Sequence, residues 1–191
     1  MEAFLVSTGV VALAEIGDKT QLLALVLAAR YRKPVPIVLG ILVSTLLNHA
    51  LAGSVGAFVA HLVDPQVMRW ILGASFVAMA VWMLIPDKLE ADQQVKPPRF
   101  GVFATTVFAF FLLEMGDKTQ IATIALAAKY PDLVAVVAGT TFGMMIANVP
   151  AVLLGEVAAT KLPLRIVRAV CAAVFAVIGV LVLLDGVLHF T

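Results

Sequence analysis

Long apolar runs constrain the fold of this 191-residue chain more than any other feature of its sequence. Charged residues or prolines interrupt the runs at only five places, and most of the resulting segments exceed the ~20 residues that a helix needs to cross a bilayer. Hydrophobic residues make up 62% of the chain, more than a soluble domain of this size can bury. The sequence therefore predicts an all-α integral membrane protein with six transmembrane helices. The predicted spans are 3–29, 35–60, 66–85, 100–128, 132–158 and 164–188.

The two halves of the chain repeat each other at a constant offset of 99 positions. The segment EIGDKTQ at 15–21 aligns with EMGDKTQ at 114–120, and further matches follow at the same offset. A repeat of three spans must enter the membrane from opposite sides in its two copies, so we predict two inverted-topology three-helix repeats. This architecture is typical of secondary transporters. The predicted units are a first repeat over 1–85, a cytoplasmic linker loop over 86–99 and a second repeat over 100–191.

Small residues four positions apart occur at equivalent places in the two halves. Gly40 and Ser44 form one such pair, and Gly139 and Gly143 form the other. Small residues at this spacing let helices approach closely in a membrane, so both pairs are predicted to be packing faces.

Basic residues gather on one side of the predicted membrane topology. The first, third and fifth connections, with the adjacent helix ends, hold nine of them, whereas the opposite side holds only Arg69 and Lys129. By the positive-inside rule those three connections lie in the cytoplasm, and both termini then lie outside it. The amino terminus lacks the basic region of a cleaved signal peptide. We expect an integral protein of the bacterial inner membrane.

The rest of the composition excludes several classes of protein. A formal charge of +1 gives no basic surface for nucleic acid. Cys171 is the one cysteine, so neither a disulfide framework nor a zinc cluster is available. The expected partners are therefore the lipid bilayer and small ions, with no resident cofactor; the sequence does not determine an oligomeric state.

Two copies of one motif place six charged residues near the middle of the first and fourth predicted spans. Charges at that depth cost about 2.5–3.5 kcal/mol each, so they must be paired, hydrated or bound to a ligand. A purely structural alternative pairs Glu15 with Lys19 on one helical face and repeats this pair in the second copy. That pairing leaves the aspartate of each copy without a partner. The six residues are Glu15, Asp18, Lys19, Glu114, Asp117 and Lys118.

The functional hypothesis follows from the symmetry of the two copies. If the motifs face each other across the pseudo-two-fold axis, four carboxylates converge near the bilayer midplane, and Lys19 and Lys118 offset part of their charge. Hard divalent cations prefer such oxygen-rich sites. Gly17 and Gly116 would let the helix loosen there and expose carbonyl oxygens. The predicted metal ligands are Glu15, Asp18, Glu114 and Asp117, with Gln21, Gln120, Thr20, Thr119, Asn48 and Asn148 as accessory residues.

A chain with two copies of Glu-x-Gly-Asp-Lys-Thr over six predicted spans resembles a family of manganese and calcium transporters. That family includes the Golgi manganese/calcium–proton exchangers of eukaryotes and manganese exporters of bacteria, within the calcium/cation antiporter and lysine exporter superfamily. The resemblance covers essentially the whole chain. It implies that the protein exports cations from the cytoplasm or loads an organelle, and that the four acidic residues of the motifs bind the ion. The linker here is short and charge-balanced, so no regulatory role of a longer acidic loop is carried over.

Charge balance suggests how such a site could work. Four carboxylates and two lysines sum to −2, which one divalent cation or two protons would neutralise. Exchange of one for the other would keep the buried charge near zero in both halves of the cycle. The predicted function is therefore secondary active export of a divalent cation, manganese first and calcium second, in exchange for protons.

Two other classes of protein share part of this pattern. A passive cation channel would use the same ligands without saturable, proton-coupled flux. An intramembrane aspartyl protease also uses paired aspartates, but a dyad that shares one proton needs neither the glutamates nor the lysines. Between manganese and calcium, nitrogen or softer donors would favour manganese. The residues that could supply one are His49, which matches Asn148 under the offset, Met144 and Met145.

Overall fold

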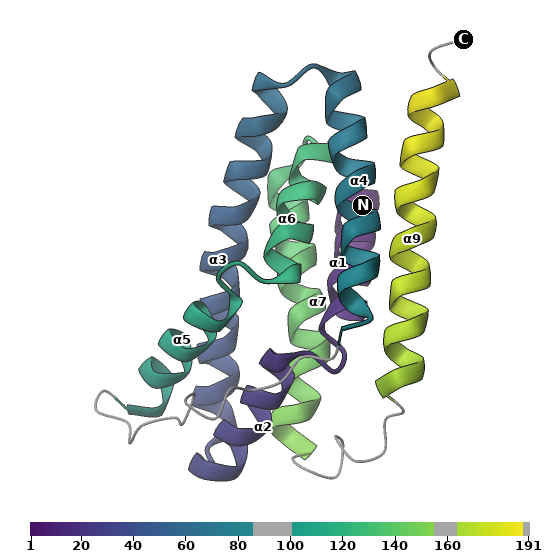
Figure 1. The fold of residues 1–191 in the computed structure, drawn as a ribbon. Helices are drawn as coiled ribbons and strands as arrows, with labels where there is room; N and C mark the ends of the chain where they lie inside the picture. The colour runs from purple at the N-terminus through teal and green to yellow at the C-terminus, as the bar shows by residue number, and fades with distance from the viewer. Residues whose placement is uncertain (86–100, 155–163, 189–191) are drawn as a thin grey trace.

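The computed structural model describes residues 1–85, 101–154 and 164–188, and these residues form eight helices (Figure 1). No strand occurs in the described ranges, so the all-α fold class is confirmed for them. The predicted cytoplasmic linker at 86–99 lies outside the described residues. The helices are α1 (Glu2–Glu15), α2 (Lys19–Tyr31), α3 (Pro34–Leu62), α4 (Pro65–Met83), α5 (Gly101–Glu114), α6 (Lys118–Lys129), α7 (Leu133–Leu154) and α9 (Leu164–Leu188).

The first and fourth predicted spans are each divided into two helices at the charged motif. α1 gives way to α2 over residues 16–18, and α5 gives way to α6 over residues 115–117. The φ angle is 80° at Gly17 and 75° at Gly116, a left-handed conformation that glycine adopts without steric cost. The prediction that these two glycines loosen the helix is confirmed.

Three of the unbroken helices, α3, α4 and α7, are long and apolar enough to cross a membrane on their own. They have 29, 19 and 22 residues, so even α4 is about 28 Å long at ~1.5 Å per residue. α5 and the segment Ala169–Leu184 of α9 are shorter apolar helices. Pro34 and Pro65 lie in the first turns of α3 and α4, where a missing backbone N–H costs nothing.

Equivalent helices of the two halves run in opposite directions. In Figure 1, α1 and α2 run from top to bottom, whereas α5 and α6 run from bottom to top. α3 runs upward and its counterpart α7 downward, and α4 runs downward beside the rising α9. The turns between α3 and α4 and between α6 and α7 lie at the top of this view, and the junction of α2 with α3 lies at the bottom.

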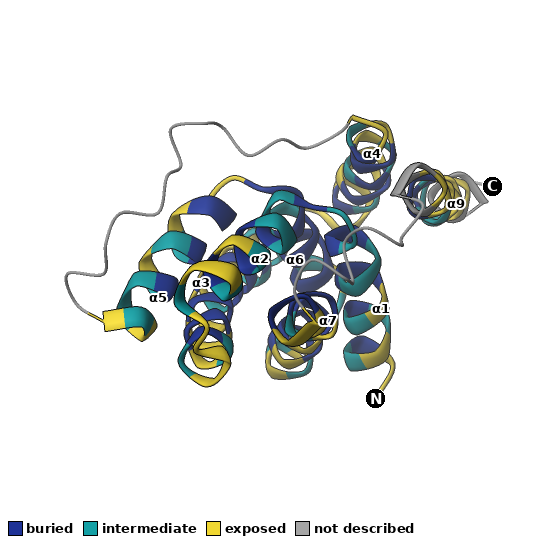
Figure 2. Ribbon diagram, turned by 90° about the horizontal axis from the view of Figure 1, so that it is seen from below, coloured by how far each residue is buried: buried dark blue, intermediate teal, exposed yellow. Residues whose placement is uncertain are grey.

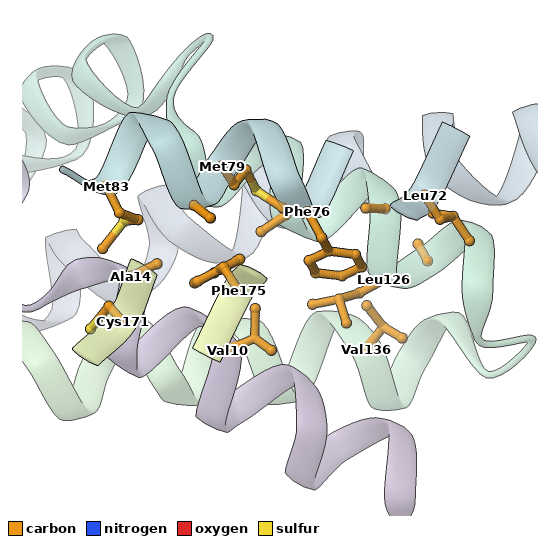
Figure 3. Packing of buried hydrophobic residues seen from close by; sticks show 14 of the residues in the cluster. Val10, Ala14, Leu72, Phe76, Met79, Met83, Leu126, Val136, Cys171 and Phe175 are labelled. Carbon is orange, nitrogen blue, oxygen red and sulfur yellow. The ribbon is translucent and has the colours of Figure 1, made fainter. Parts of the chain in front are cut away.

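Helix packing also follows the repeat. α1 packs along α7, and its counterpart α5 packs along α3. α3 and α7 contact each other, and α4 packs along α9. Figure 3 shows the larger hydrophobic cluster, to which α1, α4, α6, α7 and α9 contribute; Phe76 and Phe175, which are 99 positions apart, have ring centroids 6.1 Å apart. A second cluster joins α2, α3, α5 and α7.

The two predicted small-residue faces are confirmed as points of close helix approach. A Cβ added at Gly139 would lie 2.5 Å from the carbonyl oxygen of Phe4 on α1. At the equivalent position of the first half, a Cβ on Gly40 would lie 3.0 Å from the carbonyl oxygen of Phe103 on α5. The two glycines therefore bring the same helix pairs together in both halves.

Exposed residues lie mainly on the outer faces of the helices (Figure 2), and many of them are large and apolar. Leu51 and Phe58 of α3, Phe108 of α5 and Leu181 of α9 are each 59–63% exposed. Apolar side chains exposed on this scale fit a surface in contact with lipid rather than with water. The four acidic residues of the motif are buried.

Candidate functional site

At both helix breaks, the acidic residues of the motif lie at the ends of the two helices that meet there. Glu15 and Glu114 are the last residues of α1 and α5, while Asp18 and Asp117 directly precede α2 and α6. Each aspartate N–H donates to the carbonyl oxygen of the glutamate three residues before it, at 3.0 Å. The positive ends of α2 and α6 thus begin at the aspartates, where they favour negative charge.

All four acidic residues of the motifs are buried, with at most 1% of their surface exposed. One carboxylate oxygen each from Glu15, Asp18 and Asp117 lies within 4.8 Å of the other two. Glu114 is not part of this group of three, although its carbonyl oxygen accepts a hydrogen bond from the N–H of Asp117. The fold therefore brings three of the four predicted ligands together from both halves of the chain and places the fourth beside them.

Each motif lysine forms an ion pair with the aspartate of the other half. Lys118 Nζ lies 2.6 Å from Asp18 Oδ1, and Lys19 Nζ lies 3.4 Å from Asp117 Oδ1. The structural alternative, a pair between Glu15 and Lys19 on one helical face, is wrong because the break at residues 16–18 separates them onto two helices. The lysines link the halves instead.

Each motif glutamate accepts hydrogen bonds from a helix of the opposite half. Asn148 Nδ2 on α7 donates to Glu15 Oε2 at 3.4 Å. Thr20 Oγ1, from the same half as Glu15, donates to the same oxygen. On α3, Asn48 Nδ2 donates to Glu114 Oε2 at 3.0 Å, and Thr45 Oγ1 donates to Glu114 Oε1 at 3.1 Å.

The two motif glutamines repeat one arrangement. Each side-chain oxygen accepts a hydrogen bond from the glycine N–H of its own break, at 2.9 Å for Gln21 and 2.8 Å for Gln120. Each side-chain nitrogen then donates across to the other half. Gln21 reaches the carbonyl oxygen of Ala147 at 3.0 Å, and Gln120 reaches Oδ1 of Asn48 at 3.2 Å. These glutamines therefore hold both breaks against α7 and α3.

Several buried oxygens at the site have no hydrogen-bond donor among the described residues. They include Oε1 of Glu15, Oδ2 of Asp117, Oδ1 of Asn148 and Oγ1 of Thr119. A buried acceptor without a donor costs about 1–3 kcal/mol, and more when it is charged. A set of such oxygens, two of them from carboxylates, suits a hard cation.

The sequence predicted twelve residues for this site, and ten of them have a side chain that forms a hydrogen bond or ion pair with the side chain of another. The buried hydroxyl of Thr119 has no hydrogen-bond partner among the described residues, whereas that of its counterpart Thr20 donates to Glu15. Thr45 was missed, because its match under the offset is Met144 and the repeat gave no signal there. His49 was considered only for ion selectivity, and the structure places its Nε2 4.0 Å from Glu114 Oε1.

A buried acidic site between two halves of an apolar helical protein is typical of a membrane transporter for cations rather than of an enzyme. Comparison with known proteins agrees. The sequence profile of the family described as "Divalent cation/proton antiporter GDT1" matches residues 3–91 and 102–189. Each matched segment contains one copy of the motif. The chain belongs to the GDT1 family of divalent cation/proton antiporters, so the family resemblance found in the motifs is confirmed.

Individual relatives span most of the chain. It is 51% identical over 176 residues to a protein of Vibrio cholerae named "Putative manganese exporter", covering 92% of this chain and 87% of that one. It is 29% identical to GDT1-like protein 3 of Oryza sativa subsp. indica, covering 91% and 71%. It is 27% identical to GDT1-like protein 5 of Arabidopsis thaliana, covering 98% and 97%. No solved structure matches the chain at a significant level.

Proposed function

We propose that this protein exports a divalent cation from the cytoplasm in exchange for protons, with manganese as the first substrate and calcium as the second. The observation that carries the proposal is the meeting of Glu15, Asp18 and Asp117, contributed by both halves of the chain and almost fully buried. Family membership supports a divalent cation and protons as substrates, and the name of the Vibrio cholerae relative supports the choice of manganese.

The proposed architecture is six spans in two inverted three-span repeats, with the broken helices meeting near the bilayer midplane. The constant offset of 99 positions, the matching breaks and the opposite helix directions in Figure 1 support it. The basic residues of the first, third and fifth connections support an orientation with both termini outside the cytoplasm. A site at the interface of two such repeats can be exposed to either side by small movements of one repeat against the other.

The proposed ligands are the four motif carboxylates. Oε1 of Glu15 and Oδ2 of Asp117 accept no hydrogen bond from the part of the chain that the structure describes, which makes them the first candidates to contact the ion. Asn148 adds a free amide oxygen beside Glu15. We assign Gln21, Gln120, Thr20 and Asn48 to positioning, because their hydrogen bonds hold the breaks and the glutamates rather than leaving lone pairs for the ion.

Charge balance provides the proposed coupling. The four carboxylates and two lysines sum to −2 when all are ionised, and either one divalent cation or two protons brings the site to neutrality. A site that reorients only when neutral carries no bare charge through hydrocarbon, where each charge would cost about 2.5–3.5 kcal/mol. Exchange then follows from the requirement that the net charge of −2 is always offset, either by one divalent cation or by two protons.

The burial of the carboxylates favours an exchanger over a passive channel. A channel needs a water-filled path through its ligands, whereas here each acidic residue has at most 1% of its surface exposed. The aspartyl protease alternative is set aside, because the family of the chain is a transporter family and the aspartates are paired with lysines.

The test is manganese uptake into inverted membrane vesicles, in which uptake into the lumen corresponds to export from the cell. We expect an acid-inside proton gradient to accelerate uptake by the wild-type protein, and a protonophore to remove the acceleration. Uptake that ignores the proton gradient would contradict the antiport proposal.

Two isosteric variants test the site in the same assay. Asp18→Asn and Asp117→Asn each remove one charge and one proton site, so uptake should fall to near background. Asp64→Asn is the matched control, because Asp64 is an exposed helix cap on α4 that asparagine can replace. If both site variants take up manganese at the wild-type rate, the proposed four-carboxylate site is wrong.

A further inference from the structure

The two halves of the site are not chemically identical, and the difference lies at one pair of equivalent positions. His49 on α3 and Asn148 on α7 are 99 residues apart, and each is a fully buried side chain beside the motif glutamate of the opposite half. Asn148 is 3.4 Å from Glu15, and His49 is 4.0 Å from Glu114. An imidazole therefore stands in one half where the other half has an amide.

Neither ring nitrogen of His49 has a hydrogen-bond partner among the described residues, although the side chain has no exposed surface. Buried polar groups normally find a partner, so an imidazole without one next to a carboxylate calls for an explanation. The amide oxygen of Asn148 is also without a donor. At both equivalent positions, a buried polar atom of the side chain thus lacks a hydrogen-bond partner among the described residues.

The distance from His49 Nε2 to Glu114 Oε1 is too long for a hydrogen bond but suits two ligands of one cation. Ligand atoms bound at about 2.0–2.6 Å can be separated by up to about twice that length. Thr45 and Asn48 donate to Glu114 and fix its carboxylate in front of the imidazole. Glu114 and His49 are therefore already arranged as a pair that a metal ion can bridge.

Nitrogen donors discriminate among divalent cations. Calcium and magnesium are hard cations that take oxygen ligands almost exclusively, whereas transition metals accept imidazole nitrogen as well. A site made only of carboxylates and amides would bind calcium at least as readily as manganese. A single imidazole among oxygen ligands shifts the preference toward the transition metal.

We infer that His49 is the manganese-selecting ligand of this transporter: its Nε2 and Oε1 of Glu114 bind the transported cation together, and the nitrogen disfavours calcium and magnesium. The inference rests on the proposed cation transport and goes beyond it, because it names the residue that sets which cation is carried. Asn148, the oxygen donor at the equivalent position, does not discriminate.

The symmetry of the chain supplies the decisive variant. His49→Asn gives the first half the amide that the second half already has, and His61→Asn is the control, because His61 lies exposed at the end of α3. Manganese binding to purified protein is titrated in the presence of calcium. We expect the calcium-to-manganese ratio of dissociation constants to fall by roughly 10–100-fold in His49→Asn, the range found when supporting partners of a metal site are changed, and to stay constant in His61→Asn.

A second measurement needs no variant. Bound Mn²⁺ is paramagnetic, and pulsed electron paramagnetic resonance detects the ¹⁴N nucleus of a coordinated imidazole. We expect a nitrogen coupling in the wild-type complex that is lost in His49→Gln. The assignment of His49 is overturned if wild-type protein binds manganese without that coupling. It is also overturned if His49→Asn leaves the calcium-to-manganese ratio of dissociation constants unchanged. In both cases the proposed transport stands. If wild-type protein binds no manganese, both fail.

Discussion

At the scale of single residues, the crossed ion pairs have unequal surroundings. The side chain of Lys118 is 4% exposed and that of Lys19 is 25% exposed, although the aspartates they meet are equally buried. A buried charge that loses its partner keeps its full desolvation penalty, whereas a pair reached by solvent is screened. The two lysines should therefore contribute unequally to stability even though the sequence treats them as equivalent.

The test is the replacement of each lysine by glutamine. Lys118→Gln leaves Asp18 buried without its ion-pair partner, so we expect the free energy of unfolding in detergent to fall by about 3–5 kcal/mol. Lys19→Gln should cost clearly less. Denaturant unfolding at neutral pH with a chelator present measures both, and equal losses would show that the exposure difference has no energetic meaning.

Residue identities near the motif were largely predictable, but their partners were not. The repeat made Glu15 and Asp18 visible because charge is scarce in an apolar chain. It could not show that Lys19 pairs with Asp117 of the other half, because that depends on a helix break whose geometry is set by Gly17. The rule that residues three or four positions apart share one helical face assumes a continuous helix, so it fails where the helix is broken.

At the scale of helices, the site depends on how closely α1 and α5 approach the opposite half. Glu15 ends α1, and α1 is held against α7 by contact with two glycines. A Cβ added at Gly143 would lie 2.6 Å from the carbonyl oxygen of Thr8 and 2.9 Å from the backbone nitrogen of Ala12. Backbone atoms of a packed helix cannot move aside, so any added volume must push α1 away from α7 and carry Glu15 with it.

We therefore expect Gly143→Ala to lower the free energy of unfolding by about 1–3 kcal/mol, as overpacking does in cores, and to weaken manganese binding as well. Gly9→Ala is the control. Gly9 lies in α1, the partner helix of α7, but a Cβ added there meets no atom within 4 Å. Thermal unfolding and a manganese titration of both variants measure the two effects. Normal binding by Gly143→Ala would mean that α1 tolerates displacement without moving the site.

Element boundaries were predictable where composition changes and less so inside the spans. Proline at positions 34 and 65 marks the starts of α3 and α4, close to the predicted spans. The predicted fourth span at 100–128 holds α5 and α6, which meet at a glycine that the sequence had already identified as a weak point. By contrast, Pro150 lies inside α7 without ending it, because packing in a helical bundle overrides the local preference.

At the scale of the whole molecule, the pseudo-symmetry is incomplete in a way that the sequence repeat does not predict. Glu15 is held by Asn148, which also contacts Met144, whereas Glu114 is held by Asn48 and Thr45 with His49 beside it. The four acids were expected to converge equally, and instead three form a tight group with Glu114 next to it.

The central claim is that one buried site alternates between a divalent cation and protons. Purified protein in liposomes allows manganese flux and proton flux to be measured together, with the membrane potential clamped at different values and the pH gradient held constant. The net charge of −2 predicts about two protons exchanged per manganese ion and a rate that does not depend on the potential. Manganese flux without a counterflow of protons, or flux driven by the potential alone, would contradict it.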